Sequence, residues 1–241
     1  MLRTLFWFIY FFLYLIYSIP SLWKANALLK KEELFEHYNH VKNISSKWAN
    51  SLLKVAGVTV HIHGKENIPQ NETCIIICNH QGNFDIPILL GSLDRKLGFI
   101  SKVEVKKLPV IRSWMKHLHC VFIDRKNRRQ SIQAIIEGVN NLKDGHDLVI
   151  FPEGTRSKGK KMAPFKKGSI KLATRSKATI LPVTIDGSYL VMEENGGIIR
   201  PNDVNLYISK PIRLHQEADG MDENELKDIV QQTIEGKIRK Q

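Results

Sequence analysis

The stretch CIIICNHQGNFD, residues 74–85, joins a short apolar run to a loop that carries a histidine and an aspartate. The run from Cys74 to Cys78 is unbroken and apolar, which is typical of a buried β-strand. The segment after Asp85, IPILL, has a proline where the first turn of a helix tolerates one. Active sites of open α/β sheets form where a strand ends and a helix begins. The stretch therefore predicts an α/β fold with a functional site in this loop.

His80 and Asp85 lie five positions apart in this loop and are candidates for a catalytic dyad. A neutral imidazole accepts a proton from a hydroxyl group, and a carboxylate bonded to its other nitrogen fixes the tautomer and stabilises the imidazolium. The dyad would therefore activate an alcohol. In the alternative, structural interpretation, the histidine bonds loop backbone and the aspartate caps the following helix.

Strands and helices alternate through the middle of the chain. Period-two alternation over residues 58–62 predicts a strand with one polar face, and later apolar runs predict further strands. These runs lie at 74–78, 97–100, 120–123, 148–151, 179–185 and 204–208, and helices are expected at 131–142, 168–175 and 222–238. Residues 108–111 are expected to form an apolar loop or helix rim. The order predicts an α/β fold with a mixed, largely parallel sheet flanked by helices.

The first 56 residues differ from the rest of the chain. No charged residue occurs from Thr4 to Trp23, and this run is dense in aromatic side chains, which favour the boundary of a bilayer. Near-helical spacing of apolar residues predicts a second helix over 24–56. We expect residues 1–56 to form a membrane-docking helical pair and residues 57–241 to form the α/β domain.

The N-terminal segment has other interpretations. Ala25-Asn26-Ala27 resembles the cleavage site of a signal peptide, although Lys24 lies between it and the apolar run. The second helix is equally compatible with packing on the soluble core. Lys24, Lys30 and Lys31 follow the run, whereas Arg3 precedes it, and this bias predicts that the main domain lies on the cytoplasmic face of the membrane.

Composition limits the possible partners. A net charge of +12 at pH 7 predicts an anionic partner, which is a nucleic acid, a phospholipid surface or a phosphorylated substrate. The three cysteines lie in or beside apolar runs and form no C-x-x-C pair, so we expect buried thiols. The pair His61 and His63 lacks a third ligand at a suitable spacing, and no metal site is expected.

Basic residues follow three of the predicted strands: Lys102, Arg125 and Arg156. The carboxyl ends of parallel strands share one rim of a sheet, so we expect these cations to lie beside the dyad. The planar fork of arginine binds two phosphate oxygens, and Gly154 allows backbone amides to approach an anion. The pattern predicts a base next to a phosphate clamp, and the alternative is an ordinary basic surface.

Four motifs in order resemble those of the glycerolipid acyltransferases. They are NHQGNFD (79–85, N-H-x4-D), VFIDR (121–125), FPEGTRS (151–157) and the proline-bearing ILPV (180–183). The resemblance covers residues 74–186 and is greatest to the bacterial 1-acyl-sn-glycerol-3-phosphate acyltransferases of the PlsC type. Gly82 departs from the pattern, because many members carry serine there.

The resemblance implies transfer of a fatty acyl group to the sn-2 hydroxyl of lysophosphatidic acid, which forms phosphatidic acid. The donor would be acyl-CoA or acyl-carrier protein as a co-substrate, with no bound cofactor. His80 would be the general base, with Asp85 holding its tautomer. Arg156, Arg125 and Lys102 would bind the acceptor phosphate, and Glu153, Gly154, Thr155 and Asn79 would position the substrate. Apolar side chains after Ile86 and around 108–114 would hold acyl chains.

Other functions remain open at this point. One alternative is an acyltransferase whose acceptor is glycerol 3-phosphate or another lysophospholipid. A second is a thioester hydrolase that uses the same dyad on water. A non-catalytic basic protein that binds membranes or nucleic acid would show salt-sensitive binding and no dependence on His80. The aromatic residues interleaved with basic ones that stack on bases are absent outside the N-terminal segment, so no nucleic-acid partner is expected.

Overall fold

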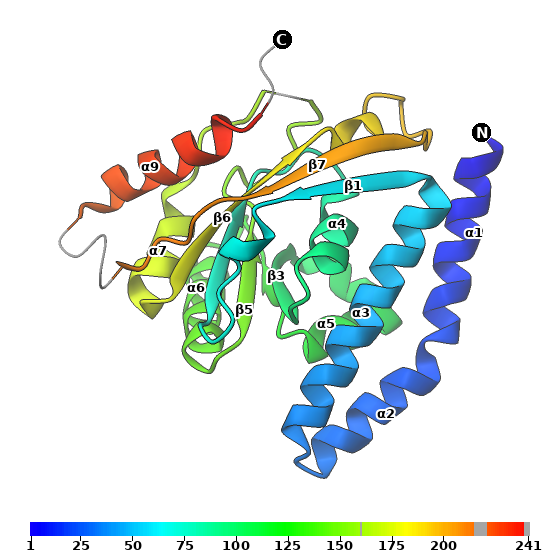
Figure 1. Ribbon diagram of the computed structural model, residues 1–241. Coiled ribbons are helices and arrows are strands. Elements are labelled where there is room, and N and C mark those ends of the chain that lie inside the picture. Colours follow the sequence, from blue (N-terminus) through cyan, green and yellow to red (C-terminus); the bar gives the residue numbers. More distant parts are fainter. Residues whose placement is uncertain (160, 215–220, 239–241) are drawn as a thin grey trace.

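A central sheet between two layers of helices forms the body of the protein (Figure 1). The computed structural model describes residues 1–159, 161–214 and 221–238. The strands are β1 (Val58–His63), β2 (Cys74–Cys78), β3 (Leu97–Lys102), β4 (Val121–Ile123), β5 (Asp147–Ile150), β6 (Thr179–Asp186) and β7 (Asn202–Ile208). Their order is β1-β7-β6-β2-β5-β3-β4. The five strands from β6 to β4 are parallel, whereas β7 is antiparallel to β6, which confirms the mixed, largely parallel sheet.

β2 lies between β6 and β5 near the centre of the sheet, and all five of its residues are buried. A strand covered on both faces needs an unbroken apolar run, which is why its sequence shows no alternation. Ile76 is in register with Leu181 on one side and with Val149 on the other. The carboxyl ends of these parallel strands therefore share one rim, and β2 delivers residue 79 to the middle of it.

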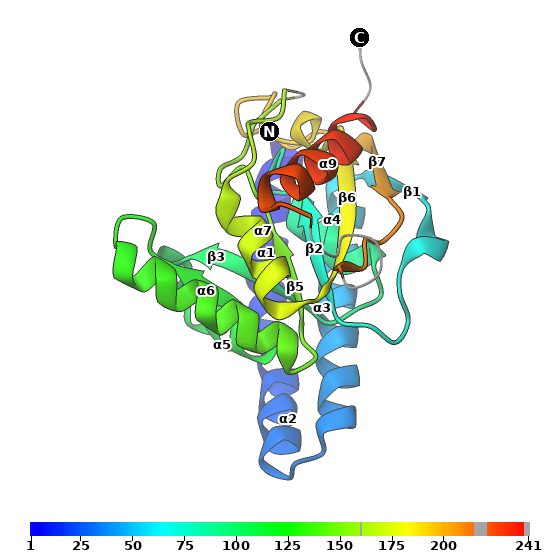
Figure 2. The same ribbon diagram turned by 90° about the vertical axis from the view of Figure 1, so that its left-hand side faces the viewer.

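Helices cover both faces of the sheet, as Figures 1 and 2 show. The helices are α1 (Leu2–Tyr17), α2 (Ile19–Lys30), α3 (Leu34–Ala56), α4 (Asp85–Ser92), α5 (Pro109–His117), α6 (Arg128–Lys143), α7 (Lys167–Ser176) and α9 (Glu223–Glu235), with short 3-10 turns at η1 (Lys65–Asn67), η2 (Val103–Lys107) and η3 (Ser188–Leu190). Ile76 of β2 packs with α3 and α4, whereas Ile75 and Ile77 pack with α6, α7 and α9. The alternation of side chains along β2 thus separates two apolar cores.

The N-terminal helices differ from the prediction of a single helix over 24–56, which is wrong. The chain turns between α2 and α3, where Glu32 adopts a left-handed conformation with φ of 59°. Lys31, Glu32 and Glu33 are charged, and this turn lies exposed in solvent. α3 packs against α4, which confirms the interpretation that it packs on the core.

α1 lies along α3, and its Trp7 joins the core through an Nε1–H that donates to the carbonyl of Leu52 at 3.0 Å. Many of its other apolar side chains are exposed, among them Leu5, Phe6, Leu13 and Ile16. Together α1 and α2 form the one stretch, in the described part of the chain, that is long and apolar enough to cross a membrane. The stretch bends at Ser18, between the two helices.

The region expected as a loop or helix rim at 108–111 begins a helix, α5. Pro109 occupies its first turn, where a missing N–H costs no hydrogen bond. The other predicted strands and helices are confirmed within a few residues, including α7 and α9. η2 and α5 follow β3 and bring apolar side chains, among them Val105, Ile111 and Trp114, close to the rim where β2 ends.

Candidate active site

His80 and Asp85 are brought together at the carboxyl end of β2, as the sequence predicts. The Nδ1 of His80 lies 2.7 Å from Oδ2 of Asp85, and the same oxygen accepts a hydrogen bond from the backbone N–H of Gly82 at 2.9 Å. Asp85 is fully buried at the start of α4, whereas 16% of the His80 side chain is exposed. An ionised Asp85 requires the proton on Nδ1, so Nε2 is left with the lone pair.

The imidazole of His80 stacks on the ring of Phe151, with the ring centroids 3.9 Å apart and the planes 14° from parallel. Phe151 follows β5, the strand next to β2 in the sheet. Stacking on one face and the Asp85 bond at one edge restrict the ring to a single orientation. The dyad is therefore held in place from two strand ends before any substrate binds.

Ser188, in η3 after β6, completes the surroundings of Asp85 and is absent from the predicted site. Its hydroxyl donates to Oδ1 of Asp85, and both residues are buried. Gln81 accepts hydrogen bonds from the backbone N–H groups of Gly187 and Ser188, at 2.9 and 3.2 Å. Ser188 is 103 residues from Asp85, so the only signal in the sequence is its place just after the fourth motif.

The predicted phosphate clamp gathers around a pocket of about 410 Å³ next to His80, called the polar pocket for the cations that line it. Lys102 at the end of β3 and Arg125 after β4 are exposed and line this pocket together with Arg156. Lys166 also lines it, and the prediction did not single it out. These four cations lie at or after the ends of three strands, β3, β4 and β5, and make the pocket suitable for a phosphate group.

The turn at residues 153–156 contributes backbone shape as well as charge. Gly154 has φ of 75°, a left-handed conformation that glycine adopts readily, and a Cβ there would lie 2.6 Å from Nζ of Lys166. Thr155 is exposed and lines the pocket with Gly154. Both residues lie where positioning of a substrate was predicted, and their roles stay predictions.

Glu153 is buried beneath the pocket and holds two loops together. Its Oε1 accepts the N–H of His80 at 2.7 Å, and its Oε2 accepts the N–H of Ala163 at 2.8 Å. Burial raises the pKa of Glu153, while the hydrogen bonds from these backbone groups act in the opposite direction. This geometry favours a role for Glu153 in shaping the site over direct contact with a substrate.

Asn79 is fixed between two strands. Its amide nitrogen donates to the carbonyl of Ile185, and its amide oxygen accepts the N–H of the same residue, both at 2.8 Å. With both polar atoms engaged and the side chain buried, Asn79 has a structural explanation that the sequence did not reveal. Contact between Asn79 and a substrate stays a prediction, and the geometry favours the structural role.

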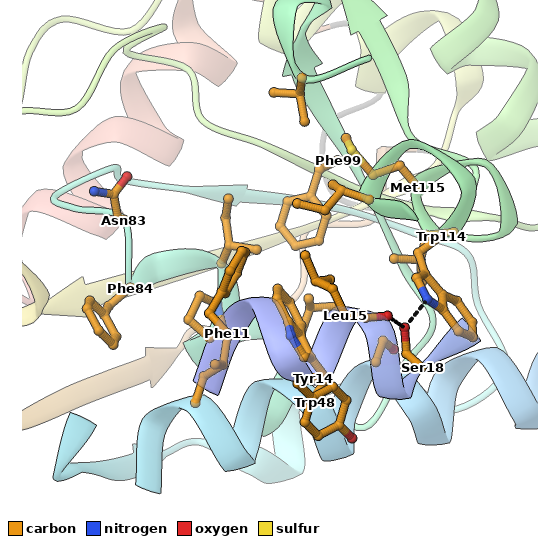
Figure 3. Close-up of a pocket in the computed structure, with 18 of the residues that line it drawn as sticks. Phe11, Tyr14, Leu15, Ser18, Trp48, Asn83, Phe84, Phe99, Trp114 and Met115 are labelled. Carbon is orange, nitrogen blue, oxygen red and sulfur yellow. Dashed lines mark hydrogen bonds between the residues drawn. The ribbon is translucent and has the colours of Figure 1, made fainter. Parts of the chain in front are cut away.

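Figure 3 shows an apolar pocket, which has a volume of about 450 Å³. This pocket adjoins the polar one. Asn83, Ile86, Phe99, Ser101 and Val105 line both pockets. The expected segments contribute Ile86, Pro87, Leu90, Ile111 and Trp114, and helices α1 and α3 add Trp7, Phe11, Tyr14, Leu15 and Trp48. The contribution of the N-terminal helices was not predicted, because it depends on how these helices pack.

The cysteines are buried free thiols, as expected. Burial raises the pKa of Cys74 and of Cys120 to about 12, and it raises the pKa of Cys78, the thiol nearest to the site in sequence, well above the usual range. A thiol with a raised pKa is a poor nucleophile at neutral pH. The arrangement therefore favours a reaction that uses His80 as a base without a covalent cysteine intermediate.

A histidine–aspartate dyad, a pocket lined by cations and an apolar pocket lie together at this rim, and comparisons with known proteins identify the family to which the chain belongs. A family model described as Acyltransferase matches residues 59–186, more than half of the chain. The crystal structure of the 1-acyl-sn-glycerophosphate acyltransferase PlsC from Thermotoga maritima superposes with a TM-score of 0.86 at 28% identity, covering 98% of this chain and 92% of that one.

Two relatives are similar in sequence. A chloroplastic 1-acyl-sn-glycerol-3-phosphate acyltransferase of Brassica napus is 34% identical over 183 residues, which cover 74% of this chain and 53% of the relative. A probable 1-acyl-sn-glycerol-3-phosphate acyltransferase of Mycoplasma pneumoniae is 36% identical over 146 residues, which cover 58% of this chain and 54% of the relative. The chain belongs to the acyltransferase family, and it spans about half the length of these two relatives.

Proposed function

We propose that this protein transfers a fatty acyl group from an acyl thioester to the sn-2 hydroxyl of lysophosphatidic acid, forming phosphatidic acid. The observation that carries the proposal is the position of the His80–Asp85 dyad, beside a pocket lined by four cations and next to an apolar pocket. The names of the relatives, 1-acyl-sn-glycerol-3-phosphate acyltransferases, support the same acceptor.

His80 acts as the general base. Its Nε2 takes the proton of the acceptor hydroxyl while the oxygen attacks the thioester carbonyl, and Asp85 stabilises the resulting imidazolium through Nδ1. The tetrahedral intermediate expels the thiolate, which takes the proton back from His80. One ester bond forms, one thioester bond breaks, and the donor leaves as a free thiol.

The acceptor phosphate binds in the polar pocket. Arg156, Arg125, Lys102 and Lys166 line this pocket, and their combined charge stabilises a phosphate that is otherwise strongly hydrated. Anchoring the phosphate fixes the glycerol backbone, so that its free hydroxyl reaches His80. A thioester hydrolase would use the same dyad on water and would have no acceptor phosphate for these cations to bind.

The apolar pocket holds an acyl chain. Its lining is almost wholly apolar, and residues such as Asn83 and Ile86 connect it to the polar pocket where the chemistry occurs. An acyl chain there leaves water, which stabilises the complex in proportion to the apolar area buried. Helices α1 and α2, with their exposed apolar side chains, dock the protein on the cytoplasmic face of the membrane that supplies the lipid.

The proposal is tested by acyl transfer with purified full-length protein in detergent. Labelled acyl-CoA and acyl-carrier protein are supplied in turn with lysophosphatidic acid, glycerol 3-phosphate and lysophospholipids of larger head group. We expect transfer to lysophosphatidic acid to be the most efficient, as judged by kcat/KM. Preferred transfer to another acceptor would correct the substrate, and hydrolysis of the donor without transfer would refute the proposal.

A further inference from the structure

Glu193 is a buried carboxylate beside the site that the proposed mechanism does not use. Only 5% of its side chain is exposed, and its Oε1 accepts the backbone N–H of Asn83 at 2.8 Å. The same oxygen lies 3.3 Å from Nη1 of Arg156. Its other oxygen, Oε2, has no hydrogen-bond partner among the residues that the structure describes. A carboxylate is costly to bury, so this position calls for an explanation.

The contact leaves part of Arg156 available for a ligand. Nη1 of Arg156 donates to Asn83 Oδ1 and to Glu193 Oε1, whereas Nε and Nη2 bond to no residue of the described chain. Nε and Nη2 form one edge of the guanidinium, and this edge binds two oxygens of a phosphate at once. Arg156 lines the polar pocket, and Glu193 does not. Glu193 thus holds the arginine from behind, outside the space that the acceptor phosphate would occupy.

Gly82 supplies the room that Glu193 needs. A Cβ at Gly82 would lie 2.4 Å from Oε2 of Glu193 and 2.9 Å from its Cδ, closer than real contacts allow. Gly82 does not have positive φ, so its backbone does not require glycine. The absence of a side chain at Gly82 therefore leaves room for the carboxylate, at a position where many glycerolipid acyltransferases carry serine.

We propose that Glu193 is a positioning residue for acceptor binding: its carboxylate fixes Arg156 through Nη1, so that the Nε–Nη2 edge is preset for the acceptor phosphate, and Gly82 makes this packing possible. The inference rests on the proposed function, because it takes the ligand of Arg156 to be the phosphate of lysophosphatidic acid. It assigns to Glu193 an effect on acceptor affinity and none on the proton transfer at His80.

The first test compares Glu193→Gln with Glu194→Gln in the full-length protein. Both variants remove one negative charge, but Glu194 is the exposed neighbour. Glu193→Gln is expected to raise the KM for lysophosphatidic acid about tenfold, the effect of weakening one charge-assisted hydrogen bond. The KM for the acyl donor and kcat are expected to stay within about twofold of the wild-type values. The unfolding temperature is expected to stay within about 2 °C of that of the wild type. Glu194→Gln is expected to match the wild type throughout.

The inference is overturned if Glu193→Gln binds lysophosphatidic acid as well as the wild type does. A parallel rise in the KM of the donor, with a fall in unfolding temperature, would show a general structural role and would overturn it as well. Calorimetric titration of lysophosphatidic acid without donor gives the same comparison when no transfer occurs. The titration separates failure of this inference from failure of the proposed function. If only the proposed function fails, the wild type binds lysophosphatidic acid without acylating it.

The second test measures the coupling between Gly82 and Glu193. Gly82→Ala alone is expected to lower the unfolding temperature, because the new Cβ overlaps the carboxylate. In a Glu193→Ala background the same change is expected to cost little, because the carboxylate is gone. An equal loss of stability in both backgrounds would contradict the role assigned to Gly82. This comparison needs no substrate and is independent of the reaction.

Discussion

The carboxylate of Asp85 receives three hydrogen bonds in a fully buried position, from His80, from the backbone of Gly82 and from Ser188. Three bonds hold the carboxylate in one orientation, so that it can fix the orientation of the imidazole. The bond from Ser188 comes from a distant segment, whereas the other two form within the loop. Ser188 therefore connects the end of β6 to the His80–Asp85 dyad.

Replacement of Ser188 by alanine tests this connection. We expect Ser188→Ala to lower kcat about tenfold, since Asp85 loses one charge-assisted hydrogen bond and orients His80 less well. The KM for either substrate should change little. Ser209→Ala is the matched control, because the buried hydroxyl of Ser209 has no partner in the described chain. Equal kcat values for the two variants would contradict the role of Ser188.

Local sequence was enough to predict the dyad and not its surroundings. His80 and Asp85 are five residues apart, so a strand end and a helix start place them together whatever the rest of the chain does. Ser188 and Glu193 reach the same loop only through the pairing of β6 with β2, a long-range contact that spacing does not encode. The same strand pairing affects Asn79, which was predicted to position the substrate. Its hydrogen bonds to Ile185 favour a structural role instead.

Between elements, the junction of α3 and α5 contains a buried histidine pair. Nε2 of His37 lies 2.9 Å from Nδ1 of His117. Burial lowers the pKa of His37, helped by the charge of Lys96, and burial with His37 and Lys96 lowers the pKa of His117 to about 4. Nearby, burial and Lys96 lower the pKa of His119 to about 3. These side chains are neutral in the folded protein at pH 7.

This junction makes stability depend on pH. In the unfolded chain these histidines bind protons near pH 6.5, whereas in the folded protein burial lowers all three pKa values and brings that of His117 to about 4. Stability is therefore complete above pH 6.5 and falls as the pH decreases from 6.5 towards 4. We expect the unfolding temperature to drop over this range, and to drop less in His117→Gln. His61→Gln, at an exposed histidine, is expected to keep the wild-type profile; a flat wild-type profile would contradict the assignment.

The apolar pocket gives a prediction at the level of α1. Leu15 points into this pocket, as Figure 3 shows, whereas Leu13 on the same helix is 59% exposed. Leu15→Trp fills part of the cavity, so we expect the kcat/KM for the longest acyl donors to fall about tenfold relative to the shortest. Leu13→Trp is the control and is expected to keep the wild-type preference. An unchanged preference in Leu15→Trp would place the acyl chain elsewhere.

The elements were predicted best where periodicity was strong. The apolar runs of β2, β5 and β6 fixed both their type and their bounds within a few residues. The turn between α2 and α3 was missed because apolar residues continue at helical spacing on both sides of Glu32. α5 was left undecided because its aromatic and basic side chains fit either a helix or a loop, and packing against α1 and α2 decides between them.

In the whole molecule, the site lies between the α/β sheet and the N-terminal helices, since both line the apolar pocket. The exposed apolar side chains of α1 favour binding to a bilayer, and the net charge of +12 favours a bilayer with anionic lipids. Lipid substrates would then enter from the surface on which the protein rests. Sequence composition predicted this membrane preference, but the shared pocket depends on the packing of α1 on α3.

Binding to lipid vesicles tests the role of α1. Leu13 and Ile16 are 59% and 62% exposed and do not line the apolar pocket. We expect the double change Leu13→Glu and Ile16→Glu to lower the partition coefficient on anionic vesicles at least about tenfold. The reason is that two apolar side chains which insert into the bilayer are replaced by charged ones. Ile136→Glu on α6 is the control. Undiminished binding of the double variant in a sedimentation assay would contradict docking through α1.

The most direct test of the central claim is the turnover of His80→Ala with lysophosphatidic acid and an acyl donor. We expect kcat to fall at least about a hundredfold, the contribution of a positioned general base, with an unfolding temperature close to that of the wild type. His63→Ala, at a histidine exposed on β1, is expected to keep full turnover. A folded His80→Ala protein with wild-type turnover would contradict the mechanism.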